Sequence, residues 1–222
     1  MNIRQLGMAT GFATRMSALN ERHPWSHNDA FHTWIHTRLP DRRGAALDVG
    51  CGRGELVAGL AGHFDSVHGT DADALMRQAA ASRCAGVPNV TIDGSDIADA
   101  PGEFDLVTMI AVLHHLDLET ALGAVRAKLR PGGRFLCVGL ARPQSVTDHV
   151  WDVASMVTNP LIGYVRHPWA ASRPAAPPPF PIADPHLSFA EIREVVQRRL
   201  PGASMRRQLA FRHTIEWERP VA

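Results

Sequence analysis

Three closely spaced glycines mark the first place in this sequence where chemistry could occur. Residues 47–54 read LDVGCGRG, with glycines at positions 50, 52 and 54, between an expected strand and an expected helix. Glycine accepts positive φ angles and lets the backbone approach a bound molecule closely. The helix that follows would direct its free N–H groups and the positive end of its dipole to the same place. This arrangement is typical of a nucleotide-binding loop.

The spacing of these glycines narrows the kind of nucleotide. The dinucleotide fingerprint is G-x-G-x-x-G, whereas here the third glycine comes one residue earlier and Glu55 occupies the fingerprint position. The pattern therefore weighs against a nicotinamide cofactor.

Acidic residues follow the next two expected strands. Asp71 stands directly after the second strand, where a carboxylate can accept hydrogen bonds from ribose hydroxyls. The alternative for Asp71 is a helix cap, a role for which Asp73 competes. Asp96 and Ile97 follow the third strand, where a carboxylate could accept a hydrogen bond from an adenine amino group.

Histidines supply the candidates for acid–base chemistry. His114 and His115 follow the fourth expected strand, while His27 and His32 belong to a stretch rich in imidazole and indole. A neutral imidazole can serve as a general base at physiological pH, although the same N-terminal stretch could simply dock on the core. His32 and His36 have the spacing of a helical metal pair, but no third ligand lies at a recognisable spacing, so we predict no metal.

The elements around these residues alternate regularly. Short apolar runs predict strands at 45–49, 66–70, 90–92, 104–112 and 134–140. Helical spacing predicts helices over 55–64 and 73–84 and another behind Asp117, which ends before Pro131-Gly132-Gly133. This alternation predicts a doubly wound α/β sheet. A capping box at 188–191 starts a further helix, and two strands are expected at 204–209 and 211–218.

The changes in pattern predict four segments. Residues 1–44 form an N-terminal helical cap, and 45–140 a cofactor-binding core. The Pro-rich span 141–187 lacks periodicity and is expected to be a lid or acceptor-pocket insertion. Residues 188–222 return to the core with a helix and its last two strands.

Composition limits the partners. The 222-residue chain has a formal charge of +1, which gives no global field to attract nucleic acid or an anionic membrane. Its three cysteines form neither a disulfide framework nor a zinc motif, and no apolar run approaches the roughly 20 residues of a membrane span. We expect a cytoplasmic protein that binds neither nucleic acid nor membrane.

Taken together, the motifs resemble the class I S-adenosylmethionine-dependent methyltransferases. LDVGCGRG is similar to the first motif of this family, HGTDAD to its ribose-binding acid and GSDI to its adenine loop. FDLVTMIAVLHHL and LRPGGRFLCVGL are similar to its fourth and fifth strands. The resemblance is strong over residues 45–140 and moderate over 188–219.

The resemblance implies a Rossmann-like doubly wound seven-stranded sheet with an antiparallel last strand and helices on both faces. It also implies S-adenosyl-L-methionine as cofactor, held at the carboxyl ends of strands one to four. The residues that it assigns to the cofactor are Asp48, Gly50, Cys51, Gly52, Asp71, Ala72, Asp96, Ile97 and Ala111. From its position in the loop, Cys51 is expected to be a packing residue rather than a reactive thiol.

The implied activity is methyl transfer to an O, N or C nucleophile of a small molecule. We expect the substrate pocket in the two segments outside the resemblance, with Trp25, Asn28, Trp151 and Trp169 as its residues. The alternatives are a cyclase-type enzyme that uses the same cofactor without methylating, and a non-catalytic cofactor-binding protein. No Asn-Pro-Pro-Tyr-like stretch occurs, which argues against methylation of nucleic-acid bases. The acceptor and the oligomeric state stay open.

Overall fold

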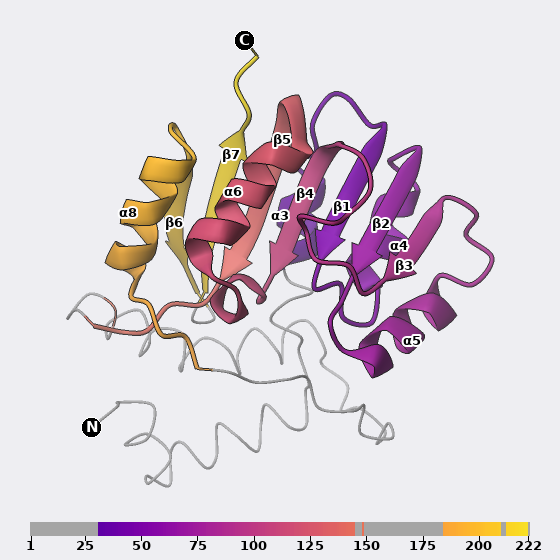
Figure 1. Ribbon diagram of the computed structural model, residues 1–222, viewed down its shortest axis with the longest axis horizontal. Coiled ribbons are helices and arrows are strands. Elements are labelled where there is room, and N and C mark those ends of the chain that lie inside the picture. Colours follow the sequence, from indigo (N-terminus) through magenta and orange to yellow (C-terminus); the bar gives the residue numbers. More distant parts are fainter. Residues whose placement is uncertain (1–30, 145–147, 149–183, 210–211, 222) are drawn as a thin grey trace, which may run out of the picture.

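The computed structural model describes residues 31–144, 148, 184–209 and 212–221 (Figure 1). Within them, seven strands form one sheet in the order β3-β2-β1-β4-β5-β7-β6. The strands are β1 (Ala45–Val49), β2 (Ser66–Thr70), β3 (Val90–Asp93), β4 (Phe104–Ile110), β5 (Leu129–Gly139), β6 (Ser204–Gln208) and β7 (Arg212–Glu218). Strands β1 to β5 pair in parallel, and β7 lies antiparallel to both β5 and β6. The predicted sheet with an antiparallel last strand is confirmed.

Helices cover both faces of the sheet (Figure 1). One face carries α3 (His32–His36), α4 (Glu55–Ala61) and α5 (Ala74–Arg83), and the other carries α6 (Leu118–Lys128) and α8 (Phe189–Arg199). Successive strand residues point to opposite faces, so Ala46 packs in the first layer and Leu47 in the second. Ile35 of α3 is fully buried in the first layer, which places the described part of the 1–44 segment on the core.

The strand order reverses between β1 and β4. In open α/β sheets this switch point leaves a crevice at the carboxyl ends of the strands, where ligands bind. β7 runs antiparallel to β5, so its first residues lie at the same edge as the last residues of β5. Gly139 accordingly pairs with His213.

At the opposite edge of the sheet, where the parallel strands begin, a buried carboxylate joins neighbouring strands. Asp105 is 1% exposed, and its Oδ2 accepts hydrogen bonds from the backbone N–H groups of Gly44 and Ala45 and from Arg130 at 2.9–3.0 Å. These contacts fix the start of β1 against β4. They lie at the end of the sheet opposite the crevice where a ligand would bind.

Two helices begin at the predicted caps, and the largest differences from the predicted strand ends occur at the start of β5 and the end of β4. Asp117 accepts a hydrogen bond from Thr120 N–H at the start of α6, and Ser188 forms a complete capping box with Glu191. β5 begins at Leu129 rather than at residue 134, because Leu129 already pairs with Phe104 across a register shift. β4 ends at Ile110 because the next residue, Ala111, leaves the extended conformation with φ 58°.

Candidate cofactor and acceptor site

The glycine loop between β1 and α4 depends on left-handed backbone. Gly50, Gly52 and Gly54 have φ angles of 68°, 54° and 76°, a region that other residues adopt only with strain. A Cβ atom on Gly50 would lie 2.1 Å from Val112 Cγ2. The loop can therefore approach the end of β4 across the switch point only with glycine at this position.

Asp71 fastens this loop to the end of β2. The Gly52 N–H donates to its Oδ2 at 2.8 Å, and the Asp73 N–H donates to its Oδ1 at 2.9 Å. Asp73, in turn, caps α5 by accepting hydrogen bonds from the Leu75 and Met76 N–H groups. The helix-cap role thus belongs to Asp73. Because an ionised carboxylate has about four acceptor sites, Asp71 can still receive two hydroxyl groups.

A second carboxylate lies buried beneath the loop. Asp48 is 3% exposed, and its Oδ1 accepts a hydrogen bond from Thr108 Oγ1 at 2.6 Å. Burial raises the pKa of Asp48 to about 7, and the charges of Asp71 and Glu55 add to this increase against the opposing Thr108 hydrogen bond. A cation placed beside Asp48 would favour its ionised form.

The remaining predicted cofactor residues lie at the same edge with different exposures. Cys51 and Ile97 are 7% exposed, while Ala72 and Asp96 are exposed. Burial raises the pKa of the Cys51 thiol far above neutrality, in agreement with a packing residue. Ala111 is the only non-glycine residue with positive φ in the described chain, directly after β4. Strained backbone of this kind occurs often at functional sites.

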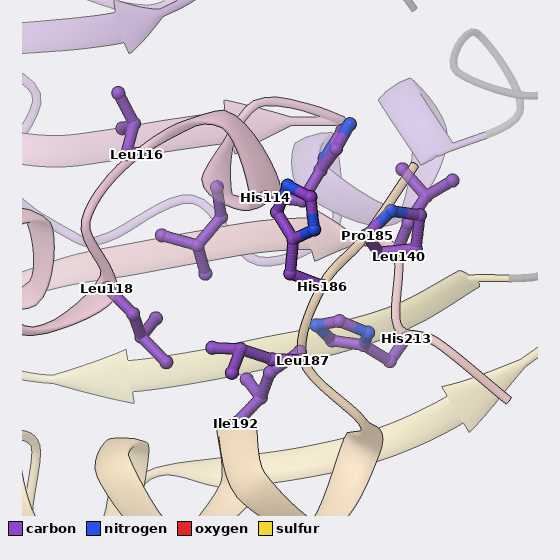
Figure 2. A pocket seen from close by; sticks show the side chains of 10 residues that line it. His114, Leu116, Leu118, Leu140, Pro185, His186, Leu187, Ile192 and His213 are labelled. Carbon is purple, nitrogen blue, oxygen red and sulfur yellow. The ribbon is translucent and has the colours of Figure 1, made fainter. Parts of the chain in front are cut away.

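An apolar pocket lies beside this region, at the ends of β4 and β5 and the start of β7 (Figure 2). Its empty volume, including space open to solvent, is about 440 Å³. Three of its residues are histidines, and the others are aliphatic. The lining residues are Leu113, His114, Leu116, Leu118, Leu140, Pro185, His186, Leu187, Ile192 and His213.

His213 is the residue that the sequence analysis did not single out. It is 2% exposed, and neither ring nitrogen has a hydrogen-bond partner. Burial lowers its pKa to about 3, and the positive charges of Arg212, Arg207 and His114 act in the same direction. The available signal was its position in the alternating run Phe211, His213, Ile215, Trp217, in which His213 is the single polar residue.

Of the three predicted catalytic histidines within the described residues, only His114 lines the pocket. His114 is half-buried, and burial, assisted by His115, lowers its pKa to about 4. The exposed His115 packs on His114 with ring centroids 4.0 Å apart. His32 begins α3 and is not among the lining residues. The other predicted residues lie outside the described part of the chain: His27, Trp25, Asn28, Trp151 and Trp169.

Similar proteins identify the family. Residues 47–135 match a family model described as a methyltransferase domain. An uncharacterized methyltransferase of Mycobacterium bovis is 32% identical over 204 residues, which cover 89% of this chain and 98% of that protein. The chain therefore belongs to the S-adenosylmethionine-dependent methyltransferases of class I, as the motifs implied.

Two solved structures share the fold. A DhpI–SAH complex superposes with a TM-score of 0.59 at 21% identity, covering 93% of this chain and 96% of that one. The magnesium protoporphyrin IX methyltransferase ChlM of Synechocystis PCC 6803, solved with bound SAH, gives a TM-score of 0.54 at 18% identity and covers 95% and 88%. SAH is the demethylated form of S-adenosylmethionine. The cofactor of this protein is S-adenosylmethionine.

The residues at the carboxyl edge fit such a cofactor chemically. Asp71 retains acceptor sites for two ribose hydroxyls, and Asp48 is a carboxylate whose ionisation a nearby ammonium group would stabilise.

No helix in the described residues is long and apolar enough to cross a membrane.

Proposed function

We propose that this protein transfers a methyl group from S-adenosylmethionine to an O, N or C nucleophile of a small molecule bound in the pocket of Figure 2. The observation that carries the proposal is the position of this pocket. It lies at the carboxyl ends of β4 and β5, on the same edge of the sheet as the glycine loop after β1 and Asp71 after β2. Aliphatic walls with a few polar groups are what a small-molecule site requires.

In this proposal the chain mainly holds and orients. Bound S-adenosylmethionine supplies an activated methyl group on a sulfonium. Gly50 and Gly52 let the backbone approach the amino-acid part, Asp71 accepts the ribose hydroxyls, and Asp96 and Ile97 flank the adenine. Fixing two reactants in a productive orientation can lower a barrier by about 7–11 kcal/mol, so no covalent nucleophile is needed.

His114 is better suited to accept a hydrogen bond than to remove a proton. With its pKa lowered to about 4, it is neutral at physiological pH but a weak base. We therefore assign His114 to orienting the acceptor rather than to removing its proton.

The segment 141–187 is proposed to complete the acceptor pocket, together with residues 1–44. In support, both ends of the longer segment meet at the pocket: Arg142 bridges to Ser188, and its N–H donates to the Leu187 carbonyl at 2.7 Å. Farther along, Asp148 accepts hydrogen bonds from the Arg207 guanidinium at 2.6 and 3.0 Å. Because segment 141–187 leaves the core and returns to it beside the pocket, we propose that it covers the acceptor.

The relatives are compatible with a small acceptor. ChlM is named for its action on magnesium protoporphyrin IX, a small molecule, and shares this fold. The small formal charge of the present chain, +1, also supports a small acceptor rather than nucleic acid.

Isotope transfer tests the proposal. Purified protein is incubated with a metabolite extract and S-adenosylmethionine labelled in its methyl group, and the products are analysed by mass spectrometry. We expect at least one small molecule to gain one labelled methyl group. A cyclase-type reaction would convert its substrate into a product that carries no labelled methyl group. Tight SAH binding with no labelled product from any extract would favour the non-catalytic alternative.

A further inference from the structure

The buried imidazole of His213 lines the pocket without a hydrogen-bond partner. The residue is 2% exposed, and both ring nitrogens lack partners, as does Nδ1 of His114 beside it. Buried polar groups in folded proteins almost always have partners, so two neighbouring imidazoles without them require an explanation. Figure 2 shows both rings at the pocket, with His213 contributed by β7 and His114 by the turn after β4.

The imidazole of His213 is fixed by its surroundings. It lies against Gly139, where an added Cβ would be 2.4 Å from Nε2, so only glycine leaves room for the ring. On another side the Phe189 ring packs edge-on at 5.9 Å, and the Arg207 guanidinium stacks on Phe189 at 3.9 Å. A polar ring held this firmly cannot turn away to find a partner elsewhere.

The lining residues indicate the chemistry of a missing partner. Seven of the ten are aliphatic or proline, three are histidines, and none is a carboxylate, lysine or arginine. A charged ligand group would lose its hydration here without meeting an opposite charge in the lining. Arg207, whose charge acts on His213 from outside the lining, is already paired with Asp148. A neutral imidazole offers one donor and one acceptor, and a hydroxyl group can satisfy either.

We propose that His213 selects the acceptor: its imidazole binds a hydroxyl group of an uncharged, amphipathic small molecule whose apolar part lies against the leucines of the pocket. This inference rests on the proposed function, because it names the class of molecule that the methyl-transfer site admits. His213 recognises the acceptor whether or not the hydroxyl is itself the methylated group.

Three probes with one alkyl chain and different head groups test this selection. 1-Octanol, octylammonium and octanoate are titrated separately into the SAH-bound protein, and binding is followed by calorimetry and by the ring resonances of ¹⁵N-labelled histidines. We expect 1-octanol to bind about tenfold or more tightly than either ion and to shift the His213 ring nitrogens. Octanoate or octylammonium binding as tightly as 1-octanol would overturn the uncharged class.

A matched pair of variants locates the effect. His213→Phe keeps an aromatic ring but removes both nitrogens, and it should weaken 1-octanol binding about three- to tenfold. His63→Phe changes the same residue type at an exposed position outside the pocket lining and should leave the affinity within about twofold. If His213→Phe does not fold, the resonances of the unaltered protein decide: octanol binding that leaves the His213 nitrogens unshifted would contradict the inference.

The same samples separate this inference from the proposed function. SAH binding without 1-octanol binding would reject the role of His213 and leave methyl transfer standing. Octanol bound at His213, combined with no labelled product in the isotope assay, would support the selectivity of the pocket and reject methyl transfer.

Discussion

At the β1–β2 half of the carboxyl edge, both oxygens of Asp71 accept backbone hydrogen bonds, and Asp48 is paired with Thr108. At the β5–β7 half, His213 is as buried as Asp48, but neither of its ring nitrogens has a hydrogen-bond partner. The first half is organised by the chain itself before any ligand arrives, whereas the second has polar groups that only a ligand or water could satisfy. A cofactor common to the whole family fits the half that the chain organises by itself. An acceptor particular to this protein fits the half whose polar groups lack partners.

The largest expected effect lies in the organised half. Asp71→Ala should weaken SAH binding about ten- to hundredfold, because hydrogen bonds to a charged group contribute roughly 1.5–3 kcal/mol. Asp73→Ala is the matched control two residues away. Loss of that helix cap should lower the free energy of unfolding by about 1 kcal/mol but leave the SAH dissociation constant nearly unchanged. Calorimetry and thermal unfolding measure the two quantities, and equal SAH affinities in both variants would remove Asp71 from the cofactor site.

The second prediction concerns the pH dependence of stability in the unsatisfied half. Burial lowers the pKa of His213 to about 3, so between pH 3 and 6.5 the unfolded chain binds more protons at this residue than the folded chain. The stability that neutral His213 permits is therefore present above pH 6.5 and lost as the pH falls. The free energy of unfolding of the wild type, minus that of His213→Phe, should rise by about 2 kcal/mol from pH 5 to pH 7. Denaturant titrations at both pH values test this, and a constant difference would mean that His213 has the same pKa in the folded and unfolded chains.

Asp48 should show the opposite sign. Its pKa is raised to about 7, so its contribution to stability is present below about pH 4 and is lost as the pH rises to 7. Binding of the cofactor's ammonium group would favour the ionised carboxylate and release a proton. SAH affinity should therefore fall by up to about tenfold per pH unit below pH 7. Calorimetry in two buffers with different ionisation enthalpies detects the released proton. Asp48→Asn should abolish both effects, and a pH-independent affinity in the wild type would place Asp48 away from any cation.

The smallest effect is expected from one added methyl group. Gly139→Ala places a Cβ against the His213 ring and should weaken 1-octanol binding about three- to tenfold while SAH binding is kept. Gly123→Ala adds the same group where no atom lies within 4 Å, in the interior of α6, and should stabilise the protein by about 0.5–1 kcal/mol. Unchanged octanol affinity in Gly139→Ala would show that the position of the ring does not matter.

The organised half could be predicted from the sequence because its signals are local. The left-handed glycines and the capping residues each act on backbone within a few positions along the chain, so their residue types carry the structural requirement. Even there, the sequence left Asp71 and Asp73 as rivals for the cap. The structure decided between them: the Leu75 and Met76 N–H groups donate to Asp73, whereas Asp71 accepts from Gly52, a residue in another loop.

Tertiary structure alone assembled the pocket half. His213 reaches Gly139 through the antiparallel register of β7 on β5, and the buried Asp105 similarly joins chain segments far apart in sequence. Neither contact has a local pattern, because strand pairing sets which distant residues become neighbours and burial sets whether their polar atoms find partners. The sequence by itself thus determined the family, the sheet and the cofactor loop, whereas the identity of the pocket residues depended on long-range pairing that residue spacing does not encode.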